Sequence, residues 1–186
     1  MSKRPSATSQ SPSTFELVSH SLEETQALGE QLGRLLKAGD VVAFYGELGS
    51  GKTTLIQGIA RGLGRDAETI KSPTFVLMRE HVGDVPLIHI DGYRLEGASA
   101  VAWLDVELIF SPHKITLIEW AERFEGLLPE TRVEIQLTHV STNRRRLVVI
   151  PHGARATSIV AALQPPATPS VASTAPAEEE SDAPGD

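Results

Sequence analysis

The sequence predicts an α/β fold with a mostly parallel central sheet, helices on both faces and a C-terminal antiparallel hairpin. Three observations lead to this prediction. Apolar runs of strand length alternate along the chain with amphipathic, helix-like stretches, several of the runs are continuously apolar, and a glycine-rich turn joins one run to a helix-like stretch. Interleaved strands and helices are typical of parallel sheets, whose strands are buried on both faces.

Each expected element has its own local signal. Ser21 and Glu24 form a capping-box pattern, which starts a helix that Gly39 is expected to end. Gly64 is expected to end a second helix, and Asn143 to occupy the turn of the closing hairpin. Strands are expected at residues 15–19, 41–45, 75–81, 87–90, 115–118, 132–138 and 146–150. Further helices are expected at residues 53–63, 101–109 and 154–163.

Length and composition describe an ordinary globular chain. It has 186 residues, of which 40% are hydrophobic and 22% charged, enough for one domain with a substantial core. No apolar run approaches the roughly 20 residues that span a bilayer, and no secretory signal is visible, so a soluble cytoplasmic protein is expected. The absence of cysteine excludes disulfides, thiolate catalysis and cysteine-ligated zinc.

The two ends of the chain differ in composition from its middle. Residues 1–14 are rich in Ser, Thr and Pro, and residues 164–186 are rich in Pro, Ala and acid. Both are predicted to be disordered tails, which leaves residues 15–163 as the working domain. The acidic tail carries five of the acids behind the net charge of −7, and a pI near 5.4 argues against a general nucleic-acid-binding protein.

The strongest chemical signal is the segment GELGSGKT, which begins at Gly46 and fits the pattern of Gly, four residues, Gly, Lys and Thr. Glycines allow the backbone to curl so that successive N–H groups and a helix N-terminus point at an anion. Lys52 is expected to contact the β- and γ-phosphates and Thr53 to ligate Mg²⁺. The alternative is a glycine-rich turn that binds nothing. The predicted nucleotide-binding positions are Gly46, Glu47, Leu48, Gly49, Ser50, Gly51, Lys52, Thr53 and Thr54.

Two acids, Asp91 and Glu119, stand at the ends of predicted strands. Parallel strands end at the same edge of a sheet, so both carboxylates are expected beside the bound phosphates. One is expected to hold Mg²⁺ and the other to orient the hydrolytic water, and the sequence leaves open which does which. Together with Lys52 they form the predicted catalytic set. The alternative for each acid is a residue that merely begins a turn.

Three further features admit two interpretations each. The segment SPTF at residues 72–75 either senses the γ-phosphate or is a plain loop that leads into a strand. The basic run at residues 143–146 either contacts a nucleotide or RNA, or is a solvated turn. His89 alternates within a predicted strand and is expected to be packed rather than to ligate a metal.

The segments GELGSGKTT, KSPTF, HIDGYRL and IEWAE, in this order, together resemble the TsaE family, from about residue 15 to residue 150. The resemblance implies a P-loop NTPase fold and a weakly hydrolysing Mg²⁺–ATPase that is required for threonylcarbamoyladenosine formation in transfer RNA. It also implies two partner proteins, the threonylcarbamoyl transferase subunit and its inactive paralogue (the TsaD and TsaB families). The family acts on this complex and does not transfer the group itself, and whether the chain contacts transfer RNA directly or only through its partners is left open.

The resemblance also implies roles for individual residues. Thr53 and Glu119 are the expected magnesium positions, with Asp91 supporting the metal or the water. Three further residues are implied as nucleotide contacts, in addition to the loop. They are Leu22, Trp120 and Arg144.

Two other functions remain open from the sequence. A small-molecule P-loop kinase would use the same loop but also needs an acceptor pocket and a closing lid. A non-enzymatic nucleotide switch would bind a partner in one nucleotide state only. No Asn-Lys-x-Asp segment for a guanine base is present, so ATP is favoured over GTP.

Overall fold

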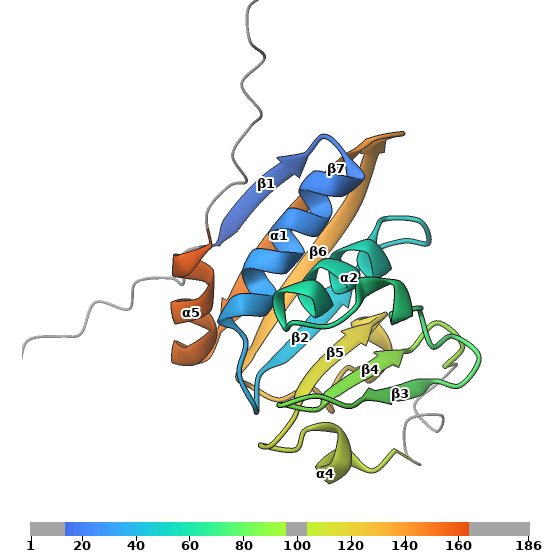
Figure 1. The fold of residues 1–186 in the computed structure, drawn as a ribbon, viewed down its shortest axis with the longest axis vertical. Coiled ribbons are helices and arrows are strands. Elements are labelled where there is room, and N and C mark those ends of the chain that lie inside the picture. The colour runs from blue at the N-terminus through green and yellow to red at the C-terminus, as the bar shows by residue number, and fades with distance from the viewer. Residues whose placement is uncertain (1–13, 96–103, 164–186) are drawn as a thin grey trace, which may run out of the picture.

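A computed structural model describes residues 14–95 and 104–163. Its core is a seven-stranded sheet in the order β1-β7-β6-β2-β5-β4-β3 (Figure 1). The strands are β1 (Phe15–Ser19), β2 (Val41–Tyr45), β3 (Met78–His81), β4 (Leu87–Asp91), β5 (Ile115–Glu119), β6 (Arg132–Ser141) and β7 (Arg144–His152). The helices are α1 (Leu22–Leu35), α2 (Lys52–Gly62), α4 (Val106–Ile109) and α5 (Gly153–Ala162), with 3₁₀ turns η1 (Ala67–Thr69) and η2 (Ala121–Phe124).

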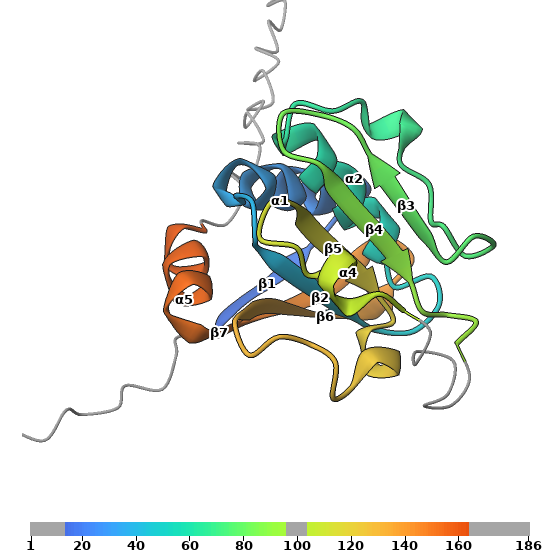
Figure 2. The same ribbon diagram turned by 90° about the horizontal axis from the view of Figure 1, so that it is seen from below.

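The middle of the sheet is parallel and its edges are antiparallel. β6, β2, β5 and β4 run in the same direction, whereas β3 pairs antiparallel with β4, and β7 pairs antiparallel with both β6 and β1. This confirms the predicted α/β class with its C-terminal hairpin. The parallel strands β2, β5 and β4 all end beside the start of α2 (Figure 2). The glycine-rich loop after β2 and the two strand-end acids therefore lie together at the carboxyl-terminal ends of the parallel strands.

The two faces of the sheet are covered differently. The three longer helices, α1, α2 and α5, pack on one face around a large apolar cluster that includes Leu28, Phe44 and Ile59. The other face is covered by the short α4, by η2 and by loop residues such as Leu127, which pack with Ile90 of β4 and Phe124 of η2 in a second apolar cluster. Helices therefore lie on both faces as predicted, but among the described residues only one face carries helices of several turns.

The α1–α2 pair is unusually close because glycines meet glycines. A Cβ added at Gly29 would lie 2.3 Å from the Leu55 carbonyl oxygen, and one at Gly33 would lie 2.2 Å from that of Ile59. α1 begins as predicted, with the Ser21 hydroxyl accepting from the Glu24 N–H at 3.1 Å. It ends at Leu35, before the predicted stop at Gly39.

The largest departure from prediction is the strand expected at residues 75–81, of which only Met78–His81 pairs. The Pro73 carbonyl accepts from the N–H groups of both Val76 and Leu77, and Leu77 has a φ of 67°. This turn occupies the backbone groups that a ladder would need. The helix expected at residues 101–109 begins only at Val106, because the Asp105 side chain caps it by accepting from the Leu108 N–H. Residues 101–103 of this prediction lie outside the described residues, as do the predicted tails except Thr14. Within the described ranges, no helix combines the length and apolarity required to cross a membrane.

Candidate nucleotide and metal site

The loop between β2 and α2 curls tightly around its own backbone. Gly46 and Gly51 have φ values of 137° and 104°, which side chains rarely allow. A Cβ at Gly46 would also lie 2.3 Å from the Leu137 carbonyl oxygen of β6. The glycines that the sequence pattern requires are therefore needed both for the conformation of the loop and for its close approach to the sheet.

Lys52 is the first residue of α2 and is only 4% exposed. Its Nζ donates to the Gly46 and Glu47 carbonyl oxygens at 2.6 and 3.0 Å and lies 4.2 Å from the centroid of the Trp120 ring. Burial lowers the pKa of Lys52, although Glu119 and other nearby carboxylates act in the opposite direction. Across the described ranges, no carboxylate forms an ion pair with Nζ. The ammonium is thus buried and cationic without a direct anionic partner.

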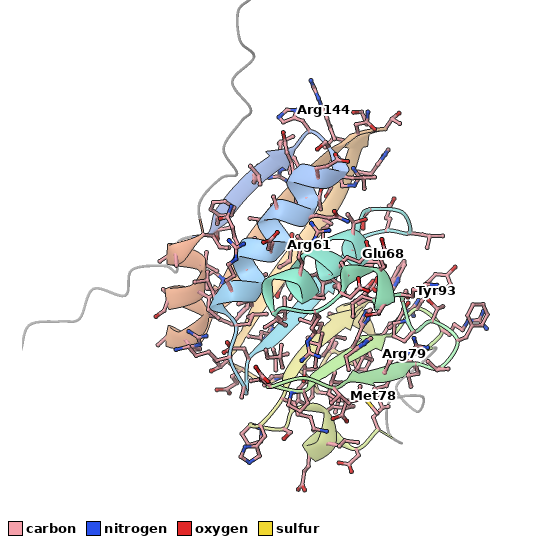
Figure 3. The ribbon with its side chains drawn as sticks, viewed as in Figure 1. Arg61, Glu68, Met78, Arg79, Tyr93 and Arg144 are labelled. Atoms are coloured by element: carbon pink, nitrogen blue, oxygen red, sulfur yellow. The ribbon has the colours of Figure 1, made fainter. Side chains whose placement is uncertain are left out.

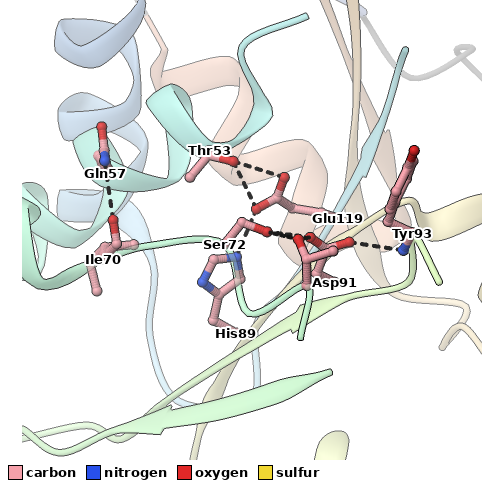
Figure 4. A network of polar contacts seen from close by, with 9 residues as sticks. Thr53, Gln57, Ile70, Ser72, His89, Asp91, Tyr93 and Glu119 are labelled. Carbon is pink, nitrogen blue, oxygen red and sulfur yellow. Dashed lines mark hydrogen bonds and ion pairs between the residues drawn. The ribbon is translucent and has the colours of Figure 1, made fainter. Parts of the chain in front are cut away.

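Glu119, the last residue of β5, is 3% exposed and is held from two sides. The Thr53 hydroxyl donates to Oε1 and Oε2 at 3.1 Å each, and His89 Nε2 lies 3.0 Å from Oε1 (Figure 4). Thr53 comes from α2 and His89 from the neighbouring strand β4. Two rigid elements thus determine where the carboxylate lies.

Asp91, the last residue of β4, is directly paired with Glu119 in the parallel register. Its Oδ2 accepts from the hydroxyls of Ser72 and Thr74, the latter at 2.5 Å, and its Oδ1 accepts from the Tyr93 N–H at 2.8 Å. Both hydroxyls belong to the loop before β3. Figure 4 shows the Ser72 side chain beside the Asp91 carboxylate. The prediction that two strand-end acids meet at one edge of the sheet is therefore confirmed in geometry.

These groups surround a cavity of about 340 Å³, within the size range of small-molecule sites. Its lining combines the glycine-rich loop, the start of α2, both acids and an aromatic wall. The lining residues are Leu48, Gly49, Gly51, Lys52, Thr53, Thr54, Ser72, Thr74, Asp91, Tyr93, Glu119, Trp120 and Arg145. The predicted loop positions Gly46, Glu47 and Ser50 form the backbone of the loop without lining the cavity.

Two predicted nucleotide contacts are not among the residues that line this cavity. Leu22 begins α1 with 49% of its surface exposed, and Arg144 is exposed at the start of β7, where its side chain projects outward (Figure 3). Arg145 lines the cavity instead and is 8% exposed. Its Nε has no hydrogen-bond partner within the described part of the chain. Strand alternation explains the difference, because Arg145 shares a face with the buried Leu147, whereas Arg144 points to the opposite face.

Ser72, Thr74 and Tyr93 also line the cavity, and His89 lies behind it. The sequence marked 72–75 only as one of two possibilities and left His89 as a packed residue. For His89 the signal was the strand period, because Leu87, His89 and Asp91 alternate onto one face of β4. That period could have placed His89 beside the site, but not its contact with Glu119.

The oxygen groups at the cavity fit a magnesium ion in chemistry. Mg²⁺ is usually held by one or two carboxylates, water and substrate phosphates rather than by a complete protein cage. No cluster of three or more His, Cys, Asp or Glu side chains suited to a metal occurs within the described residues. The Thr53 hydroxyl with Glu119 and Asp91 is therefore the kind of sparse, oxygen-only set that this ion uses.

Comparison with known proteins bears on the identity of the chain. The family model described as "Threonylcarbamoyl adenosine biosynthesis protein TsaE" matches residues 19–147. The chain belongs to the TsaE family. The matched TsaE region contains the glycine-rich loop, both strand-end acids and Arg145.

Individual relatives agree. The tRNA threonylcarbamoyladenosine biosynthesis protein TsaE of a Nostoc species is 38% identical over 146 residues, covering 75% of this chain and 87% of that protein. The TsaE protein of Treponema pallidum is 39% identical over 135 residues, covering 71% of this chain and 97% of that protein. The crystal structure of Bacillus subtilis YdiB superposes with a TM-score of 0.69 at 29% identity and covers 83% of this chain and 97% of that one.

Proposed function

We propose that this chain binds ATP with Mg²⁺, hydrolyses it slowly on its own, and serves threonylcarbamoyladenosine formation in transfer RNA in the cytoplasm. Membership of the TsaE family supports the place in transfer RNA modification. A single observation supports the chemistry. The glycine-rich loop, the buried unpaired cation of Lys52 and two strand-end carboxylates meet around one cavity.

The phosphates would lie against the loop and the N-terminus of α2. There, backbone N–H groups and the helix dipole favour negative charge. Lys52 Nζ would exchange the Gly46 and Glu47 carbonyl oxygens for phosphate oxygens, and this exchange offsets the cost of its burial. Arg145 would add a second cation, aimed by strand alternation into the same cavity.

The two carboxylates would divide the remaining work. Thr53 and Glu119 would hold the magnesium ion, which neutralises charge on the phosphates when bound. Asp91 would orient the attacking water, because its loop partners Ser72 and Thr74 line the cavity beside it. This arrangement brings oxygen acceptors to the water and cations to the transferred group. Trp120 would lie beside the nucleotide, since it contacts Lys52 and lines the same cavity.

The partners proposed for the chain are the threonylcarbamoyl transferase subunit and its inactive paralogue, of the TsaD and TsaB families. We infer that the chain acts on that complex and does not transfer the group itself. Its hydrolysis of ATP is therefore expected to be slow in the isolated chain and faster with the complex. Turnover measured with and without the transferase pair separates a partner-stimulated ATPase from a passive switch. A phosphoryl-transfer screen on nucleosides and sugars separates both from a kinase, because one efficient acceptor would identify a kinase.

The deciding experiment is calorimetric titration of ATP, with and without Mg²⁺, into the chain and into a Lys52→Ala variant. Parent protein should bind, and the variant should lose binding because it lacks the buried cation at the phosphates. Lys37→Ala removes an exposed lysine after α1 and is the matched control, which should bind like the parent. Equal affinity in Lys52→Ala and parent would refute the proposal.

A further inference from the structure

His89 lies in the middle of β4, completely buried, on the sheet face that α2 covers. Strand alternation places it on the same face as Leu87, which belongs to the apolar cluster beneath α1 and α2, and as Asp91, which lines the cavity. In the parallel register His89 is opposite Leu117, one step diagonally from Glu119. From there its Nε2 reaches Glu119 Oε1 at 3.0 Å.

We propose that His89 is a positioning residue, which holds the Glu119 carboxylate in the orientation that receives the divalent cation; this rests on the proposed function. The two carboxylate oxygens have different partners. Oε1 accepts from both His89 and Thr53, whereas Oε2 has Thr53 alone among the residues that the structure describes. The tether at Oε1 fixes the plane of the carboxylate and leaves acceptor capacity on Oε2 for the cation.

The direction of the hydrogen bond follows from its partner. An ionised carboxylate only accepts, so His89 Nε2 carries a proton and donates it to Oε1. Nδ1 is buried and has no hydrogen-bond partner within the described ranges. Burying such an atom is unfavourable, and a leucine or isoleucine would fill this place in the core better. Packing therefore does not explain the imidazole, whereas the contact with Glu119 does.

A carboxylate tethered in this way is already oriented before the cation arrives. The glutamate side chain has several rotatable bonds, and restraining them beforehand removes an entropic cost from binding. Groups that hydrogen-bond a metal-ligating side chain typically change metal affinity or activity 10- to 100-fold when removed. His89 contacts neither the loop nor Lys52 in any described interaction, so its effect should be confined to the cation.

The test uses the full chain and a non-hydrolysable ATP analogue, AMP-PNP. Its affinity is measured by calorimetry in EDTA and in Mg²⁺, and the ratio of the two dissociation constants reports the contribution of the cation. His89→Leu should bind AMP-PNP in EDTA like the parent, but should lose about 10- to 100-fold of the Mg²⁺-dependent tightening. His89→Gln, whose amide N–H reaches to a similar point, should recover most of it.

His89→Asn is the matched control, because it is polar and small like glutamine but its amide N–H corresponds to Nδ1 and falls short of Glu119. If His89→Leu does not fold, His89→Gln and His89→Asn decide. Full Mg²⁺-dependent tightening in His89→Gln but not in His89→Asn supports the proposal, and equal tightening in the two variants overturns it. Failure of all three to fold also overturns it, since His89 would then be structural. If AMP-PNP binding by the parent protein does not tighten in Mg²⁺, the proposed function itself is refuted. If it does tighten, and folded His89→Leu shows the same Mg²⁺-dependent tightening, the positioning role alone is refuted.

Discussion

Glu119 and Asp91 are neighbours at the same level of the sheet, yet they are held in opposite ways. Glu119 is fixed by α2 and by the interior of β4, through Thr53 and His89. Asp91 is bonded to a loop, through Ser72 and Thr74, and to the backbone of Tyr93. One carboxylate is thus tied to the rigid core and the other to a segment without regular structure.

The difference teaches how one site can combine precision with movement. A cation needs ligands in fixed positions, which helices and strands provide better than loops. A segment that responds to the γ-phosphate, one of the two interpretations of residues 72–75, must be able to move. Loops open at a lower free energy than the helices and strands of the core. The exposed Phe75 and Val76 lie in the loop on the Asp91 side, so movement there would alter the surface beside the cavity.

The largest effect is expected from Glu119→Gln. The amide keeps the size and much of the hydrogen bonding of the carboxylate but loses its charge, so the chain should fold while turnover falls about 100- to 1,000-fold. Steady-state ATP hydrolysis with the transferase pair, together with circular dichroism, measures both. A variant that no longer folds would make Glu119 a structural residue.

Asp91→Asn should separate the two acids. Because Asp91 is assigned to the water and the loop, turnover should fall about 10- to 100-fold, while the Mg²⁺-dependent tightening of AMP-PNP stays close to that of the parent. The measurements are ATP turnover and the calorimetric ratio defined above for His89→Leu, both applied to Asp91→Asn and to Glu119→Gln. Equal losses of this ratio in both variants would remove the contrast between the acids.

Ser72→Ala combined with Thr74→Val tests the loop directly. Hydrogen bonds to a charged group contribute about 1.5–3 kcal/mol each, so loss of both should lower the opening free energy of residues 72–77 by at least 1.5 kcal/mol. Hydrogen exchange followed by mass spectrometry measures this opening, with peptides from α2 as the internal control. Unchanged exchange in the loop would contradict its attachment to Asp91.

The smallest effect concerns His81, whose ring centroid lies 6.4 Å from that of His89. Burial lowers the pKa of His81, and His89 and two arginines add to the effect. Below about pH 6.5 the unfolded chain therefore binds a proton that the folded chain refuses, and stability falls as the pH drops through this range. His81→Gln should flatten the decline in urea unfolding between pH 7.5 and 5.5. An identical decline in variant and parent would show that His81 does not contribute.

The elements with strong local chemistry were predicted closely. The strands at residues 15–19 and 41–45 have the predicted bounds, and the acids at the ends of β4 and β5 lie where the apolar runs stop. The loop after Tyr45 was identified by its glycine spacing together with Lys52 and Thr53, and its backbone angles require glycine at Gly46 and Gly51. In contrast, the strand expected from residue 75 was wrong over its first three residues, because the N–H groups of Val76 and Leu77 both donate to the Pro73 carbonyl in a turn.

By itself, the sequence determined the α/β class, the glycine-rich loop and the two carboxylates at one edge of the sheet, because strand period, turn chemistry and apolar runs act over a few neighbouring residues. Only the tertiary structure decided that Arg145 rather than Arg144 faces the cavity, that His89 reaches Glu119, and that Ser72 and Thr74 bind Asp91. These contacts join segments far apart along the chain. Their geometry depends on strand register and helix placement, which are settled only when the whole core packs.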